Sequence, residues 1–174
     1  MYRKTVRPKL IPSEELAKML FEVFAKKGYA LTSIADLTQA TGMKTPSLYL
    51  AFSNKEGMYI AALKYYRQHW LIELERCLQD KTQPFEQRMH NFLHSAFKLF
   101  SCDGKPLGCL MTFSALAFQA DETGFTTQLR DERLTFTQWL ENEARDAQKS
   151  EELASNVSPE AFACFILTLE MGWR

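Results

Sequence analysis

Glycine, proline and cysteine are all scarce in this sequence, with 7, 6 and 4 of them among 174 residues. Because 46% of the residues are apolar, the scarcity of glycine and proline excludes a low-complexity or disordered chain and predicts a packed globule. The four cysteines are far apart and form no Cys-x-x-Cys motif: Cys77, Cys102, Cys109 and Cys164. This spacing favours free thiols in a cytoplasmic protein over a disulfide framework.

Long apolar runs are also missing, because polar residues interrupt each one well short of a membrane span. The segment Met1 to Leu10 is basic, but no uninterrupted apolar segment follows it, so no signal peptide is expected. Strand-like alternation of apolar and polar residues is absent as well. We therefore expect an all-α, cytoplasmic protein without a membrane partner.

Charge is unevenly distributed, although the formal net charge is zero. Residues 1–55 contain 9 Lys+Arg against 4 Asp+Glu, whereas residues 56–174 contain 12 against 17. This asymmetry predicts a basic module that meets a polyanion, attached to an acidic body with another task.

Helix signals divide the basic module into three short helices. The first begins at Ser13, a good N-cap, and ends at Gly28. The second begins near Thr32 or Ser33 and runs to about Ala40, after which Gly42 breaks the chain. In the third, Thr45 is placed as N-cap and Pro46 as the first helical residue.

A fourth helix is expected to open at Ser53, because Ser53-Asn54-Lys55-Glu56 matches the capping box Ser-x-x-Glu. It continues without a linker into the body. Further helices are expected over Phe85–Phe100, Leu107–Ala120 and Phe125 to about Lys149, with a last one after Ser158-Pro159. The chain stops at Arg174 within this last apolar helix, so the helix is expected to be truncated.

A helix, a glycine turn and a short helix with a hydroxyl-rich edge form a helix-turn-helix pattern. Lys44, Thr45 and Ser47 lie at the end that enters a major groove, where base edges are read. Tyr49 and Lys55 are placed to contact phosphates, the first through its hydroxyl and the second through its charge.

The stretch FAKKGYALTSIADLTQATGMKTPSLYLAFSNKEGMY resembles the DNA-binding domain of the tetracycline-repressor (TetR) family of transcriptional regulators. The resemblance implies an all-helical homodimer that binds a palindromic double-stranded DNA operator and releases it when a small-molecule inducer binds. It implies a DNA-binding domain at residues 1–58, with a basic arm at 1–11, and a ligand-binding and dimerisation domain at 59–174. It also matches Lys44, Thr45 and Ser47 to base-reading positions, Pro46 to the start of the recognition helix, and Tyr49 and Lys55 to backbone-contacting positions.

The body is expected to hold the inducer in an apolar cavity between its helices. Candidate lining residues are Tyr66, Trp70, His94, Phe97, Met111 and Phe113. The dimer contact is expected around Phe136, Leu140, Phe165 and Leu169.

Other functional classes find little support. His90 and His94 have metal-ligand spacing on one helical face, but a metal site needs further ligands, so no metal is expected. The sequence contains no nucleophile–base pair and no glycine-rich phosphate loop, so neither enzymatic activity nor a cofactor is expected. A thiol-based redox or electrophile sensor remains the alternative, because Cys109 follows Gly108 at the expected start of a helix, where the dipole favours a thiolate.

Overall fold

The computed structural model describes residues 13–101, 109–110 and 124–172, and these residues form helices and no strand. Their order is α1 (Ser13–Leu31), α2 (Ile34–Thr41), α3 (Thr45–Phe52), α4 (Lys55–Tyr66), η1 (Arg67–Leu71), α5 (Ile72–Gln79), α6 (Phe85–Ser101), α8 (Gly124–Lys149) and α9 (Pro159–Gly172). The all-α prediction is confirmed. The helix expected over 107–120 lies largely outside the described residues, and so does the basic arm.

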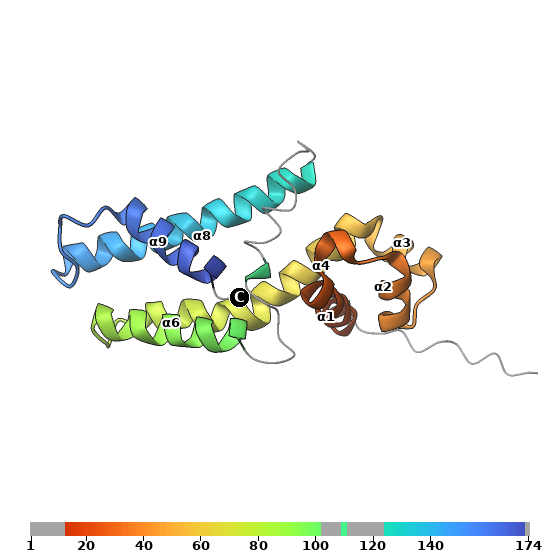
Figure 1. The fold of residues 1–174 in the computed structure, drawn as a ribbon, viewed down its shortest axis with the longest axis horizontal. Helices are drawn as coiled ribbons and strands as arrows, with labels where there is room; N and C mark the ends of the chain where they lie inside the picture. The colour runs from red at the N-terminus through yellow and green to blue at the C-terminus, as the bar shows by residue number, and fades with distance from the viewer. Residues whose placement is uncertain (1–12, 102–108, 111–123, 173–174) are drawn as a thin grey trace, which may run out of the picture.

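Two groups of helices lie at opposite ends of an elongated molecule (Figure 1). Helices α1 to α3 form one end, and α5, α6, α8 and α9 form the other. Helix α4 belongs to both, because it packs along α1 and then continues through η1 into α5 without leaving helical geometry. Among the described residues, no helix is both long and apolar enough to pass through a bilayer.

A single apolar core runs from one end to the other along α4. Its fully buried members include Phe24, Leu37 and Leu48 in the small end, Tyr59 and Tyr66 on α4, and Phe92 on α6. Each Å² of apolar surface removed from water stabilises the fold by about 25 cal/mol, so a core shared by the two ends holds them together. A movement of α4 therefore changes the packing at both ends.

The helix boundaries follow the predicted signals except in α1 and around α3 and α4. Helix α1 extends to Leu31, beyond the end predicted at Gly28, although Gly28 has a positive φ of 71° and kinks the helix there. The predicted capping box at Ser53 is wrong, because Ser53 has a positive φ of 68° and ends α3 by donating its backbone N–H to the Tyr49 carbonyl. Asn54 caps α4 instead, and its side chain accepts the backbone N–H of Gly57 at 2.7 Å. At the other end of α3, Lys44 is the N-cap and Thr45 is the first helical residue, one position earlier than expected.

Candidate functional site

The angle between α2 and α3 is fixed by the turn at Gly42 and by the core beneath it. Gly42 has a φ of 66°, which favours glycine. Leu37 on α2 and Leu48 on α3 are both fully buried. Beside them the buried Thr41 hydroxyl donates to the Leu37 carbonyl at 2.7 Å and accepts the Met43 backbone N–H at 3.3 Å. The buried Thr41 hydroxyl of this turn is thus hydrogen-bonded both as a donor and as an acceptor.

The outward side of α3 holds the predicted DNA-contacting residues together. Thr45, Pro46 and Ser47 are exposed, the N-cap Lys44 is exposed beside them, and Tyr49 is 39% exposed. Leu50, to which the sequence assigns no DNA-contacting role, is 90% exposed on the same helix. The sequence already predicts this position, because the helical phase that turns Leu48 inward leaves Leu50 outside.

The start of α2 is held by a compact polar cluster. Ser33 and Asp36 form a reciprocal capping box, and Lys27 of α1 donates to the Asp36 carboxylate at 2.6 Å. The hydrogen bond from Lys27, followed by those from Ser33, lowers the pKa of Asp36 to about 2. An ionised Asp36 therefore ties α2 to α1 and sets the position from which α3 projects.

Lys55 lies in the first turn of α4, with its ammonium 4.3 Å from the centre of the Tyr29 ring. Partial burial lowers the pKa of Lys55, and it also raises the pKa of Tyr29, with the Glu56 charge adding to that rise. The aromatic contact holds a cation at the positive end of a helix, close to the end of α3. Such a pre-positioned cation can meet a phosphate oxygen.

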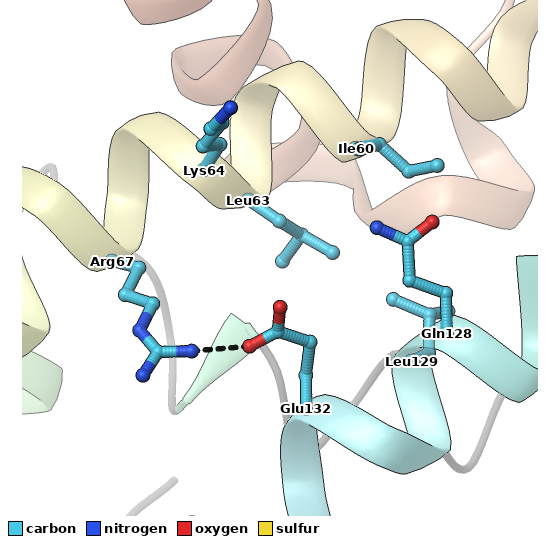
Figure 2. Close-up of a pocket in the computed structure, with 7 residues that line it drawn as sticks. All are labelled: Ile60, Leu63, Lys64, Arg67, Gln128, Leu129 and Glu132. Atoms are coloured by element: carbon cyan, nitrogen blue, oxygen red, sulfur yellow. Dashed lines mark hydrogen bonds and ion pairs between the residues drawn. The ribbon is translucent and has the colours of Figure 1, made fainter. Parts of the chain in front are cut away.

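A cavity of about 300 Å³ lies between α4 and α8 (Figure 2). Apolar side chains from both helices line it, namely Ile60, Leu63 and Leu129. Arg67 and Glu132 form an ion pair beside it, and Lys64 and Gln128 complete the lining. A more open and polar groove continues along α8, lined by Thr127, Asp131 and Thr135 and sharing Arg67, Gln128 and Glu132 with the cavity.

Four of the predicted inducer-binding residues belong to the part of the chain that the structure describes, and they lie elsewhere. Tyr66 is buried and stacks on Phe21 of α1, and Trp70 is half-buried near the same ring. His94 and Phe97 are exposed on α6. Met111 and Phe113 lie outside the described residues. None of the first four lines the cavity between α4 and α8.

The cavity residues were missed for an identifiable reason. Positions 60, 63, 64 and 67 have the spacing of a single helical face, which is a signal that the sequence does contain. Their partner face on α8 is about sixty residues away, and no local pattern connects the two. Arg67 and Glu132 can be paired only when the fold is known.

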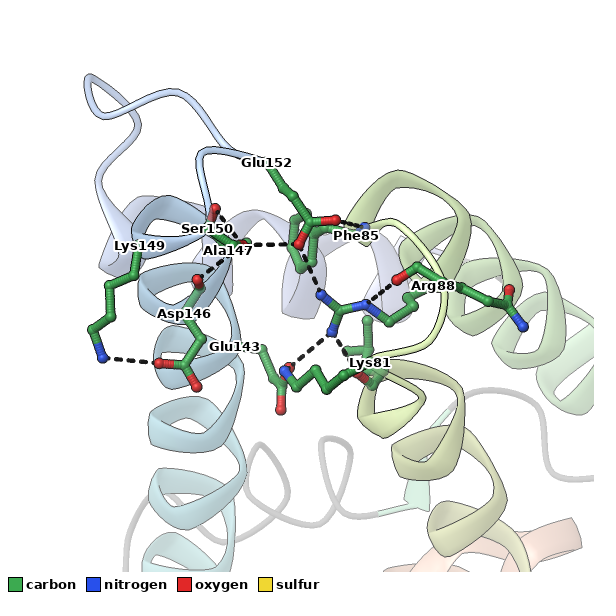
Figure 3. Close-up of polar contacts among 11 residues, drawn as sticks. Lys81, Phe85, Arg88, Glu143, Asp146, Ala147, Lys149, Ser150 and Glu152 are labelled. Atoms are coloured by element: carbon green, nitrogen blue, oxygen red, sulfur yellow. Dashed lines mark hydrogen bonds and ion pairs between the residues drawn. The ribbon is translucent and has the colours of Figure 1, made fainter.

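A buried polar cluster fastens the far end of the body (Figure 3). The Arg88 guanidinium, only 3% exposed, donates to the Leu78 carbonyl at 2.6 Å and to the Gln83 carbonyl at 3.1 Å. It also lies 3.4 Å from the carboxylates of Glu143 and Glu152. Arg88 thus ties α5 and α6 to α8 and the segment after it, and Lys81 pairs with the same Glu143. We assign this cluster to stability.

Comparison with known proteins agrees with this arrangement. A family described as "Bacterial regulatory proteins, tetR family" matches residues 20–62. The HTH-type transcriptional repressor ComR of Escherichia coli K12 is 29% identical over 124 residues, which is 71% of this chain and 59% of ComR. BdcR, another such repressor of the same organism, is 30% identical over 105 residues, or 60% of this chain and 53% of BdcR.

The chain therefore spans somewhat more than half the length of these two curated relatives. Among solved structures, the TetR family transcriptional regulator CifR, complexed with a 26-bp double-strand operator DNA, aligns with a TM-score of 0.83 and 27% identity. The alignment covers 96% of this chain and 87% of that one. The match includes both α1 to α3 and the helical body. Residues 20–62 thus match the TetR family of bacterial regulatory proteins, and the chain resembles regulators of that family in sequence and in fold.

Proposed function

We propose that the protein is a DNA-binding transcriptional repressor that leaves a palindromic operator when a small molecule binds its body. The observation that carries the DNA-binding part is the outward side of α3, where Thr45, Ser47 and Tyr49 are exposed together over the buried Leu48. The excess of basic residues in 1–55 supplies attraction to a polyanion. CifR bound to operator DNA and the repressor ComR support the same proposal.

The DNA contacts divide into two classes. Lys44, Thr45 and Ser47 are proposed to read base edges as Pro46 and the first turn of α3 enter the major groove. Tyr49 and Lys55 are proposed to hold phosphates, which positions the helix without reading sequence.

Fluorescence anisotropy with the duplex upstream of the protein's own gene, and with a scrambled duplex, tests this assignment. Tyr49→Phe and Lys55→Ala should lower the affinity for both duplexes by the same factor. Lys44→Ala and Ser47→Ala should instead reduce the ratio of the affinity for the upstream duplex to that for the scrambled one. Lys98→Ala, an exposed lysine on α6, is the matched control and should change neither. The proposal would be contradicted if the unaltered protein bound both duplexes with equal affinity. It would also be contradicted if none of the four substitutions changed the affinity for DNA.

For the inducer we propose the cavity between α4 and α8. It lies between the helix that supports the DNA-binding module and a helix of the body, and the Arg67–Glu132 ion pair joins η1, which continues α4, to α8. A ligand that binds there and favours a different separation of α4 and α8 would shift the population of DNA-binding and released states. Tyr66 and Trp70, which pack on Phe21 of α1, would transmit that shift to the module.

Filling the cavity tests the inducer site. Compounds that lower DNA affinity are first found by screening a metabolite library against the protein–duplex complex. Leu129→Trp should abolish or strongly weaken their effect, because the larger side chain occupies the space. Gln138→Trp, an exposed position on the same helix, should leave the response intact. A full response in Leu129→Trp would place the ligand elsewhere.

One observation favours a second candidate, a thiol-responsive regulator. The Tyr66 hydroxyl donates a hydrogen bond to the Cys109 sulfur at 3.7 Å, and a donor there stabilises a thiolate. Cys109 is nevertheless buried, at 4% exposure, whereas Cys164 is exposed. Treating the protein–DNA complex with N-ethylmaleimide separates the candidates: release that is lost in Cys109→Ser supports the thiol mechanism, and release that persists there excludes it.

A further inference from the structure

One side chain on α3 is apolar and almost fully open to solvent. Leu50 is 90% exposed, the largest value among the exposed large hydrophobic side chains of the described residues. It lies in the middle of a helix whose other outward residues are those proposed to meet DNA. The DNA contacts described so far use no apolar side chain beyond Pro46.

The phase of α3 fixes the direction in which Leu50 points. Leu48 is fully buried and so marks the inward direction of the helix. Leu50 follows two residues later, which is about 200° around an α-helix and nearly opposite to Leu48. Pro46 lies one turn before Leu50 on the same face, and Ser47 and Tyr49 lie on either side. The outermost line of α3 is therefore apolar, between two hydroxyl-bearing residues.

Exposure alone does not identify a contact, because single apolar side chains are common on protein surfaces. Leu31, at the end of α1, is 80% exposed and illustrates this. Leu50 differs from Leu31 in its position. Leu50 projects between Ser47, which is proposed to read base edges, and Tyr49, which is proposed to hold a phosphate, so a duplex that meets both also faces Leu50.

We infer that Leu50 contacts the C5-methyl group of a thymine in the major groove and makes that thymine a specificity determinant. The inference rests on the proposed DNA-binding function. The C5-methyl of thymine is the apolar group that base pairs present in the major groove, whereas the other edges present hydrogen-bond donors and acceptors. A leucine set against those donors or acceptors would desolvate them without replacing their hydrogen bonds, which is unfavourable. The leucine therefore favours thymine by apolar attraction and disfavours the other bases because their hydrogen bonds would be left unmade.

Replacing thymine by deoxyuridine removes only the methyl group and gives a direct test. A duplex is first selected from a randomised library by binding to the full chain. Each thymine of the selected duplex is then changed singly to deoxyuridine, and affinity is measured by anisotropy. For one thymine in each half-site, affinity should fall about fourfold, as expected for one methyl-sized group removed from an apolar contact.

Leu50→Ala should be insensitive to the same deoxyuridine change, so the leucine and the methyl form a coupled pair. Leu50 is already exposed, so its replacement should not impair folding. Leu31→Ala removes the same atoms from another exposed position and should keep the full sensitivity. Pro46→Ala is a second comparison, because Pro46 shares the outward face.

Each failure has its own meaning. If no duplex is enriched over random sequence, the proposed DNA-binding function fails and the inference fails with it. If a duplex is enriched but Leu50→Ala responds to deoxyuridine as the unaltered protein does, only the inference is overturned. If Pro46→Ala loses the sensitivity to deoxyuridine while Leu50→Ala keeps it, the methyl contact belongs to Pro46 and the inference about Leu50 is also overturned.

Discussion

The carbonyl oxygen of Phe52 occupies the space into which any side chain at position 57 would project: a Cβ on Gly57 would lie 2.0 Å from it. Phe52 ends α3 and Gly57 belongs to the first turn of α4. The absence of a side chain at Gly57 therefore allows α3 to end directly against α4. The close contact sets how α3 projects from the helix that continues into the body.

Gly57→Ala is consequently expected to displace the last turn of α3. The free energy of unfolding should fall by about 1–3 kcal/mol, as for other overpacked sites. DNA affinity should fall further than this loss of stability explains, because the exposed face of α3 is reoriented. Urea unfolding and anisotropy, measured on the same preparations, separate the two effects.

Gly42→Asn is the matched control for that substitution. Gly42 has a positive φ, but apart from its neighbours along the chain no atom lies within 4 Å of the position that its Cβ would occupy, and asparagine tolerates this conformation. The variant should lose little stability. If Gly57→Ala were as mild as Gly42→Asn, the close approach of α3 and α4 would not limit this turn.

Much of the small end could be predicted from local signals. Ser33 with Asp36, Gly42, and the buried Leu37 and Leu48 each act within one turn or one helix pair, so sequence spacing reveals them. The turn between α3 and α4 was predicted less well, because Ser53 and Asn54 are both good caps and the choice depends on the packing of Gly57 against Phe52.

The body was less predictable for a different reason. Leu140, expected at a dimer contact, is fully buried within the chain, because the period of an apolar helix does not distinguish a core face from an interface. His94 and Phe97 were expected to line a cavity, but both are exposed on α6. Cavity residues come from helices far apart in sequence, and their meeting is a property of the tertiary fold.

Stability should depend on pH through Asp36. The folded-state pKa is lowered from 3.8 to about 2, so the ionised carboxylate stabilises the fold above the unfolded value and this contribution is lost as pH falls toward about 2. Asp36→Asn should therefore be less stable than the unaltered protein at pH 6, and the difference should shrink near pH 3. Urea unfolding at both values checks this. Glu22→Gln, which neutralises an exposed carboxylate on α1, is the control. Its difference in free energy of unfolding from the unaltered protein should be the same at both pH values if the effect belongs to Asp36.

The outer surface of α8 and α9 is the surface on which we expect two copies to meet. Leu134 is 47% exposed on α8 and Phe165 is 60% exposed on α9. Phe165→Glu should shift the mass measured by light scattering from a dimer toward the 20.1 kDa of one chain without unfolding it. Phe97→Glu, which changes a phenylalanine of similar exposure on α6, should leave the dimer intact. A Phe165→Glu protein that stayed dimeric would exclude this surface.

Arg88 should be among the most sensitive positions of the body. Arg88→Met removes the donor shared by the Leu78 and Gln83 carbonyls and leaves the buried Glu143 with Lys81 alone, so unfolding should become easier by about 3–5 kcal/mol. Arg76→Met makes the same chemical change in an ion pair whose side chains are both 63% exposed, and it should cost less than about 1 kcal/mol. Adding Glu143→Gln to Arg88→Met should cost less than the two single changes together, because the charge left unpaired is then gone. Strict additivity would show that Arg88 stabilises the body through its carbonyl contacts and that its proximity to Glu143 contributes nothing.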